Sequence, residues 1–219
     1  MEVNYGDLQM WWRQYAHCYE KRSWLDYRPL LAEVIHYSLG GPLVDVGCGY
    51  GFLIECARQF GIPAIGLEGA EPALVAGRQR HPQADIRAWQ AGTPLDLPAN
   101  FAGAVTLNEV IDHISLEHNR QLFTDIHKTL RPGGVVIIKS PAKYNRFDKD
   151  TGHVTFFTPS EFRSFLESLR FEILTQPYVP QPLLGKSRLG WFAMRVVAKF
   201  LKPAKWAARI DSVARKPLA

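Results

Sequence analysis

The sequence is poor in cysteine and has no long apolar run. Its three cysteines, Cys18, Cys48 and Cys56, form neither an even disulfide set nor a close pair with zinc spacing. We therefore expect free thiols and a cytoplasmic protein in a reducing compartment. Apolar stretches such as residues 101–107 are much shorter than the ~20 residues that a membrane-spanning helix needs. The polar, acidic start at residues 1–7 is not typical of a secretory signal.

Acidic residues are absent between Glu172 and Asp211, while the chain as a whole has a net charge of +5. This stretch holds seven basic residues: Lys186, Arg188, Arg195, Lys199, Lys202, Lys205 and Arg209. Such a segment indicates either an ordinary solvated face or a surface for an anionic or lipid-linked substrate, the latter placing the protein at the membrane periphery. Nucleic acid is the less favoured partner, because the chain has no separate recognition domain.

The composition excludes intrinsic disorder over most of the chain, since 47% of the 219 residues are hydrophobic and 21% are charged. Short apolar runs alternate with helical patterns, which predicts an α/β domain with a mainly parallel sheet. Apolar strands without polar alternation indicate helices on both faces. The expected strands are residues 42–46, 62–67, 85–89, 103–107, 135–139 and 171–175, and the expected helices are 52–60, 72–80, 116–130 and one that begins at 159.

A glycine-dense turn follows the first expected strand. Gly47, Gly49 and Gly51 are two residues apart, and each can adopt positive φ and let a ligand approach the backbone. The turn leads into a helix N-terminus, where free N–H groups point at the ligand. The spacing is G-x-G-x-G, and Phe52 follows, so the G-x-G-x-x-G pattern of dinucleotide-binding proteins is not met.

Two acidic residues flank this turn. Asp45 lies just before the first glycine, where a carboxylate suits a cationic ligand better than a pyrophosphate. Glu68 ends the second expected strand, 21 residues after Gly47, where an acid can accept hydrogen bonds from both ribose hydroxyls. A nucleoside with a cationic, amino-acid-like tail meets both demands, and S-adenosylmethionine is such a molecule.

The sequence resembles the class I S-adenosylmethionine-dependent methyltransferases in four segments: residues 44–51, Glu68, residues 95–98 and residues 130–134. The loop after the third strand, residues 89–93, lacks the acid that the family usually offers to the adenine amino group. Cys48 is interpreted as a small residue tolerated near the ligand, not as a nucleophile. The resemblance implies cofactor contacts at Asp45, Gly47, Cys48, Gly49, Gly51, Glu68, Gly69, Gln90, Ala91, Gly92, Asn108 and Glu109.

The resemblance also implies a fold and a division of the chain. The expected fold is a Rossmann-like, doubly wound, mainly parallel seven-stranded sheet with helices on both faces and an antiparallel last strand near residues 210–216. The expected parts are an N-terminal helical cap at 1–40, the cofactor-binding core at 41–176, a basic insertion near the acceptor cleft at 177–206, and the final strand and tail at 207–219. The proline-rich start of the insertion, residues 177–182, is interpreted as a rigid connector.

Acids and histidines follow the fourth expected strand. Glu109, Asp112 and His113 are spaced i, i+3 and i+4, so they share one face if the segment is helical, and His153 follows later in the chain. This set resembles the ubiquinone-pathway O-methyltransferases and the small-RNA 3′-end 2′-O-methyltransferases. In those relatives two acids and two histidines can hold a divalent cation, here Mg²⁺, Mn²⁺ or Zn²⁺ at Glu109, Asp112, His113 and His153.

Three interpretations of this cluster remain open: a metal-free general base at His113 or His153 with Asp112 beside it, a metal site, or a structural role. We expect methyl transfer to a hydroxyl oxygen of a small-molecule acceptor. The alternatives are an RNA ribose methyltransferase, a membrane-associated quinone or lipid methyltransferase, and a non-catalytic protein that binds S-adenosylmethionine. The apolar segment 189–201 is also compatible with a homodimer surface.

Overall fold

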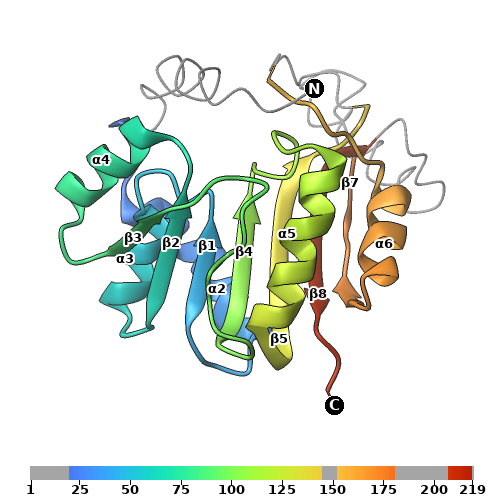
Figure 1. Cartoon of the computed structure of the whole chain (residues 1–219), viewed down its shortest axis with the longest axis horizontal. Coiled ribbons are helices and arrows are strands. Elements are labelled where there is room, and N and C mark those ends of the chain that lie inside the picture. Colours follow the sequence, from blue (N-terminus) through green and yellow to red (C-terminus); the bar gives the residue numbers. More distant parts are fainter. Residues whose placement is uncertain (1–19, 145–151, 181–206, 219) are drawn as a thin grey trace, which may run out of the picture.

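The computed structural model describes residues 20–144, 152–180 and 207–218 (Figure 1). A mixed sheet forms its centre, with the strand order β3-β2-β1-β4-β5-β8-β6 and with β7 paired to β8. Neighbours from β3 to β5 are parallel, and β8 runs antiparallel to β5, β6 and β7. The strands are β1 (Leu43–Val46), β2 (Ala64–Glu68), β3 (Asp85–Ala88), β4 (Ala102–Asn108), β5 (Leu130–Pro141), β6 (Glu172–Thr175), β7 (Tyr178–Pro180) and β8 (Ala207–Arg215).

Helices cover both faces of this sheet. In Figure 1, α5 and α6 lie in front of the strands, and α2 and α3 lie behind them. The two layers bury separate apolar clusters, because successive side chains of a strand point to opposite faces. Thus Ala104 of β4 packs with α2 and α3, whereas Val105 packs with α5 and α6. The helical elements are η1 (Trp24–Tyr27), α2 (Arg28–Tyr37), α3 (Phe52–Gln59), α4 (Glu71–Arg80), α5 (Leu116–Thr129) and α6 (Pro159–Ser168).

The predicted fold class is confirmed: the sheet is mainly parallel, helices lie on both faces, and the last strand is antiparallel. The helix after residue 158 begins as its sequence predicts. The Thr158 hydroxyl accepts the Glu161 backbone N–H, and the Glu161 carboxylate accepts the Thr158 N–H. The prediction of a rigid connector at 177–182 is wrong in its first half, because Tyr178–Pro180 forms β7 and pairs with β8.

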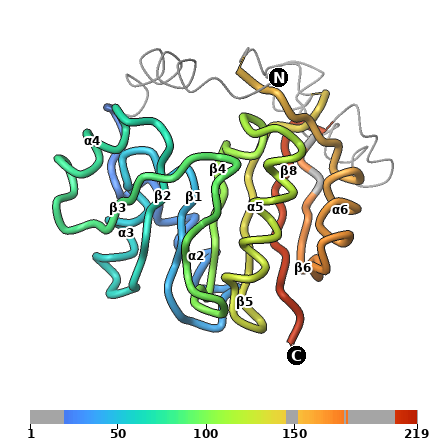
Figure 2. Tube along the Cα trace, viewed as in Figure 1, coloured from blue at the N-terminus to red at the C-terminus, as the bar shows by residue number. Residues whose placement is uncertain are grey.

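The parallel strands end at one edge of the sheet, the upper edge in the view of Figure 2. Because β8 is antiparallel, its first residues reach this same edge, where Arg209 is paired with Pro141 of β5. Two predicted segments, the first half of the N-terminal cap (1–19) and most of the basic insertion (181–206), lie outside the described residues. Within the described residues, no helix is long and apolar enough to cross a membrane.

Candidate active site

The glycine turn after β1 has a backbone that side chains would disturb. Gly47, Gly49 and Gly51 have φ values of 70°, 56° and 73°, in the left-handed region that favours glycine. A Cβ on Gly47 would lie 2.5 Å from Val110 Cγ2, and one on Gly51 would lie 2.4 Å from Ile86 Cδ1. Glycine is therefore required at both positions for packing as well as for conformation.

Asp45, at the end of β1, is buried and accepts a hydrogen bond of 2.6 Å from the Thr106 hydroxyl on the adjacent strand β4. Burial raises the pKa of Asp45 to about 7; the hydrogen bond from Thr106 lowers it, and the negative charge of Glu68 raises it further. The ionised carboxylate is thus costly in the ligand-free protein. A bound cation would stabilise it.

Glu68, at the end of β2, spans the glycine turn and the start of α4. Its two carboxylate oxygens accept the backbone N–H groups of Gly49 and Ala70, each at 2.7 Å. Burial raises the pKa of Glu68 in spite of these bonds. Neither Glu68 nor Asp45 forms a salt bridge with a lysine or arginine in the described chain. Two buried acids without a cationic partner favour a ligand with a positive charge.

The loop after β3 is a closed turn. The Trp89 indole N–H donates to the Thr93 carbonyl at 3.1 Å, and the Thr93 hydroxyl donates to the Gln90 carbonyl at 2.6 Å. A Cβ on Gly92 would lie 2.8 Å from Nε2 of His118, so α5 holds this loop in place. The loop begins beside the end of β2, where the Trp89 backbone N–H donates to the Glu68 carbonyl at 3.0 Å. A cofactor role for Gln90, Ala91 and Gly92 stays a prediction. Asn108 ends β4.

Two further predicted cofactor residues, Cys48 and Gly69, lie beside the acids in positions where little space is left for a side chain. Cys48 is buried in the turn, and burial raises the pKa of its thiol well above the ordinary value, so it is not a thiolate nucleophile. Gly69 follows Glu68 directly, and a Cβ there would lie 3.0 Å from the Trp89 carbonyl oxygen. Both positions thus favour small residues where two loops approach each other.

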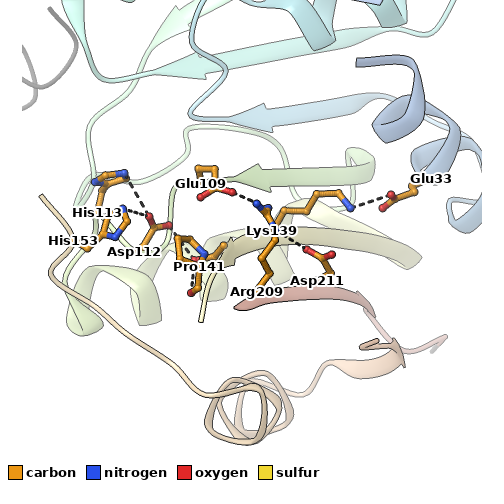
Figure 3. Close-up of polar contacts among 10 residues, drawn as sticks. Glu33, Glu109, Asp112, His113, Lys139, Pro141, His153, Arg209 and Asp211 are labelled. Carbon is orange, nitrogen blue, oxygen red and sulfur yellow. Dashed lines mark hydrogen bonds and ion pairs between the residues drawn. The ribbon is translucent and has the colours of Figure 1, made fainter. Parts of the chain in front are cut away.

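Asp112, His113 and His153 lie close together at the same edge of the sheet as the glycine turn. Asp112 Oδ2 lies 2.8 Å from His153 Nε2 and 3.5 Å from His113 Nε2. The Ser140 hydroxyl at the end of β5 donates to Asp112 Oδ1 at 3.0 Å. The Asp112 backbone carbonyl accepts the N–H groups of Val154 and Thr155, which fixes the histidine segment to the turn. Figure 3 shows the two imidazoles beside this one carboxylate.

Asp112 is held as a carboxylate. Burial of its side chain, which is 2% exposed, opposes ionisation. The hydrogen bond from His153 and the charges of the two imidazoles outweigh burial, so the pKa of Asp112 lies below its usual value. An ionised acid bonded to an imidazole orients that ring and stabilises its protonated form.

Glu109, Asp112 and His113 would share one face only in a helix, and this segment is not helical. Residues 109–115 form a turn between β4 and α5, and Glu109 has φ of 58°. Its carboxylate forms an ion pair of 2.7 Å with Arg209 of β8 (Figure 3). Donor atoms of only three residues, Asp112, His113 and His153, lie within 4.8 Å of one another in the described chain. The structure therefore brings together three of the four predicted metal ligands and holds Glu109 apart.

Arg209, predicted as part of a basic surface, is held by neighbouring acids. Besides Glu109 it contacts Asp211 at 3.5 Å. Lys139 at the same edge pairs with Glu33 of α2 at 2.9 Å. The other six basic residues of the predicted surface lie outside the described residues. Arg209 by itself therefore offers little free positive charge to an anionic partner.

Sequence reasoning missed Thr106 and Ser140, which hold Asp45 and Asp112. Both face a carboxylate on another strand or loop, and nothing near them in the sequence marks that contact. The only available signal was a polar residue within or just after an apolar strand, which is common in sheets covered on both faces.

A model of the methyltransferase domain matches residues 15–176, about three quarters of the chain. The chain belongs to the S-adenosylmethionine-dependent methyltransferases. The family accounts for the two unpaired acids, since its cofactor has a sulfonium, an ammonium and a ribose. S-adenosylmethionine is thus the cofactor of this family, and the ends of β1, β2 and β3 are where the sequence predicts it to bind.

Curated relatives are similar over different lengths. A trans-aconitate 2-methyltransferase of Azoarcus sp. is 35% identical over 127 residues, which are 54% of this chain and 46% of the relative. A ubiquinone biosynthesis O-methyltransferase of Alkalilimnicola ehrlichii is 26% identical over 217 residues, 94% of this chain and 74% of the relative. The chain spans about half the length of the first three curated relatives that it matches.

A solved methyltransferase of Archaeoglobus fulgidus has the same fold. It superposes with a TM-score of 0.68 at 16% identity, over 94% of this chain and 99% of that structure. At this identity the likeness supports the architecture alone. Within that architecture, the methyltransferase core places the glycine turn and the Asp112 cluster at one edge of the sheet.

Proposed function

We propose that this methyltransferase transfers a methyl group to a hydroxyl oxygen of a small-molecule acceptor, with His153 as the general base. The observation that carries the proposal is the 2.8 Å contact between Asp112 and His153 at the carboxyl edge of the sheet. An imidazole has a suitable pKa for taking a hydroxyl proton near neutral pH. His113, whose ring centroid is 4.6 Å from that of His153, is the second candidate for this role.

Asp45 and Glu68 have separate tasks in this proposal. Asp45 binds the ammonium end of the cofactor, and Glu68 accepts hydrogen bonds from its ribose while its carboxylate still bonds the turn. When bound, S-adenosylmethionine supplies a methyl group on a positively charged sulfur. The protein aligns the acceptor oxygen with that carbon, which can supply on the order of 7–11 kcal/mol of the barrier in favourable cases.

His153 takes the proton that the acceptor hydroxyl loses as the new oxygen–carbon bond forms and the carbon–sulfur bond breaks. Asp112 stabilises the resulting imidazolium, and Ser140 keeps Asp112 from rotating. The bonds of Val154 and Thr155 to the Asp112 carbonyl hold the histidine in register with the turn.

A second candidate mechanism uses a divalent cation at Asp112, His113 and His153. The supporting observation is that one donor atom from each lies within 4.8 Å of the others. Two imidazoles and one carboxylate suit Mn²⁺, Zn²⁺ or Fe²⁺ better than Mg²⁺, which prefers oxygen ligands. In this candidate, the three side chains would hold the ion beside the acceptor, and the ion would lower the pKa of the hydroxyl.

The test is calorimetry with S-adenosylhomocysteine, with and without divalent ions, followed by a methyl-transfer screen over phenols, aliphatic alcohols, carboxylic acids and amines. We expect binding without metal and turnover with a hydroxyl acceptor. His153→Ala should remove turnover while cofactor binding persists, and His36→Ala, an exposed change on α2, should alter neither. Turnover that survives His153→Ala and His113→Ala would refute the general-base proposal. Binding without turnover over the whole screen would favour a non-catalytic protein.

We also propose two alternative functions, a membrane-associated quinone or lipid methyltransferase and an RNA ribose methyltransferase, which rest on the basic residues 186–209 and on the acid–histidine set. Flotation with anionic and neutral vesicles tests the first. Salt-dependent RNA binding tests the second, because phosphate contacts weaken steeply as salt increases. We also propose that the segment 177–206 selects the acceptor, and exchanging it with that of a relative should change the acceptor range.

A further inference from the structure

An apolar hollow lies beside the Asp112–His153 pair. It has a volume of about 340 Å³ and lies between the start of α5 and the chain segment before α6. Six described residues line it: Ser115, Leu116, Val154, Thr155, Phe156 and Phe157. None of the six carries a charge. Its size is within the range of small-molecule pockets.

Both hydroxyl groups of the lining take part in hydrogen bonds within the protein. The Thr155 hydroxyl donates to the Ile114 carbonyl at 2.5 Å, and the Ser115 hydroxyl accepts the His118 backbone N–H at 3.2 Å. What remains available to a ligand is mostly carbon. Leu116, Val154 and Phe156 gather at this hollow and are 47%, 47% and 44% exposed.

The hollow and the histidine are parts of one unit. The Phe156 ring lies 6.1 Å from the His153 ring, measured between centroids. Val154 and Thr155 line the hollow, and both donate backbone hydrogen bonds to the Asp112 carbonyl, at 2.8 and 3.1 Å. The hollow therefore borders the same chain segment that carries His153, and Phe156 is the lining residue whose ring is near the His153 ring.

We propose that this hollow binds the uncharged apolar part of the acceptor, an aromatic ring or an aliphatic chain attached close to the reacting hydroxyl. The inference rests on the proposed function, because it takes the hydroxyl to lie at His153. Removing apolar surface from water stabilises binding in proportion to its area. A charged group in the same place would lose water without gaining a partner. The hollow should thus select acceptors that are neutral in the part that it binds. The basic segment at residues 186–209, in contrast, predicts an anionic acceptor.

The experiment measures binding of 4-alkylphenols, from methyl to pentyl, to the protein saturated with S-adenosylhomocysteine. We expect affinity to rise about fourfold for each added methylene that is buried, which corresponds to roughly 0.8 kcal/mol. Phenols that carry a terminal carboxylate on chains of equal length should bind at least tenfold more weakly than the alkyl compounds. A flat series, or tighter binding of the carboxylates, would overturn the proposal.

Two variants test whether the dependence on chain length arises in the hollow. Phe156→Ala should flatten the dependence on chain length, and Val154→Ser provides a second, milder change if the first does not fold. Phe60→Ala, at the end of α3, removes an equally large side chain that is 57% exposed and should leave the series unchanged. A dependence that persists in both hollow variants would also overturn the proposal.

The two proposals can fail separately. If the chain-length dependence is present and needs Phe156, but neither phenols nor aliphatic alcohols are methylated, the hollow is a binding site and the proposed function is wrong. If phenols are methylated with no dependence on chain length or on Phe156, the function stands and the assignment of the hollow is wrong.

Discussion

Asp112 Oδ2 lies 2.8 Å from Nε2 of His153, although α5 and β5 separate the two residues in the chain. The contact depends on Ser140 from β5 and on two backbone hydrogen bonds from the residues that follow His153. A buried carboxylate that is fixed in this way restricts the orientation of the imidazole. The pair is therefore the most direct point at which to test catalysis.

Asp112→Asn should lower kcat by about 10²–10⁴ with little change in cofactor affinity, because the imidazole loses its orienting carboxylate and the stabilisation of its protonated form. Steady-state kinetics with a hydroxyl acceptor measure the effect, and calorimetry with S-adenosylhomocysteine measures binding. Ser140→Ala should have a smaller effect in the same direction. An Asp112→Asn protein with wild-type kcat would show that the pair is structural.

Cofactor affinity should depend on pH through Asp45. The pKa of this carboxyl is about 7 in the ligand-free protein, and only its ionised form attracts an ammonium group. Affinity should therefore fall about tenfold from pH 8 to pH 6, the factor by which the carboxyl becomes protonated. Calorimetry at both pH values tests this, and Asp45→Asn should bind weakly at both. Equal affinity of the wild-type protein at the two values would contradict it.

The same carboxyl should reduce stability at neutral pH. Its pKa is about 7 in the folded state and near 4 in the unfolded chain. The folded state therefore binds more protons between these values, and the contribution of Asp45 to the free energy of unfolding falls as pH rises from about 4 to about 7. Asp45→Asn should thus be more stable than wild type at pH 7.5, on the order of 2–4 kcal/mol, with the difference shrinking toward pH 4. Urea unfolding at several pH values measures it.

Metal binding should depend on three protein ligands, Asp112, His113 and His153, and not on the fourth predicted ligand, Glu109. Glu109 pairs with Arg209 and lies outside the donor cluster, so Glu109→Gln should change Zn²⁺ or Mn²⁺ affinity by less than about twofold. His153→Ala and Asp112→Asn should weaken binding by at least about tenfold, by analogy with the cost of disturbing metal sites. Calorimetry on protein freed of metal with a chelator distinguishes these cases. A large loss in Glu109→Gln would mean that the acid moves into the cluster.

The glycine turn should tolerate no side chain at Gly47. Gly47→Ala combines a left-handed backbone with a Cβ 2.5 Å from Val110 Cγ2, and should destabilise the fold by more than the ~1–2 kcal/mol of the backbone effect alone. Gly61→Ala is the matched control, since Gly61 has φ of 69° but no atom within 4 Å of an added Cβ. Thermal unfolding of both variants separates packing from conformation. Equal losses would show that the close approach to Val110 is unimportant.

The positions of the glycine turn, Asp45 and Glu68 could be predicted from the sequence, because each lies at or next to the end of a predicted strand. The carboxyl ends of parallel strands meet at one edge of the sheet, so these residues were expected there. The orientation of Glu109 could not be found in this way. Helical spacing places it with Asp112 and His113, but the left-handed backbone at Glu109 breaks that periodicity. Its partner Arg209 comes from a strand whose register only the assembled sheet establishes.

The short strand β7 escaped prediction for a related reason. Prolines near residues 177–182 argue against a strand, yet a strand that pairs on one side only can keep a proline where no N–H is needed. Similarly, Thr106 and Ser140 are ordinary strand residues until the sheet brings carboxylates next to them. Local sequence therefore predicted which residues lie at the strand ends better than it predicted the contacts of the acid–histidine cluster.

The position of β8 has a consequence for biosynthesis. Among the described strands it comes last in the chain, yet it lies between β5 and β6 and not at the border of the sheet. Until it inserts, the nascent chain exposes an unpaired edge of β5, and Glu109 lacks the guanidinium that faces it. A stalled or truncated chain that ends before residue 207 would thus be a substrate for chaperones or proteases.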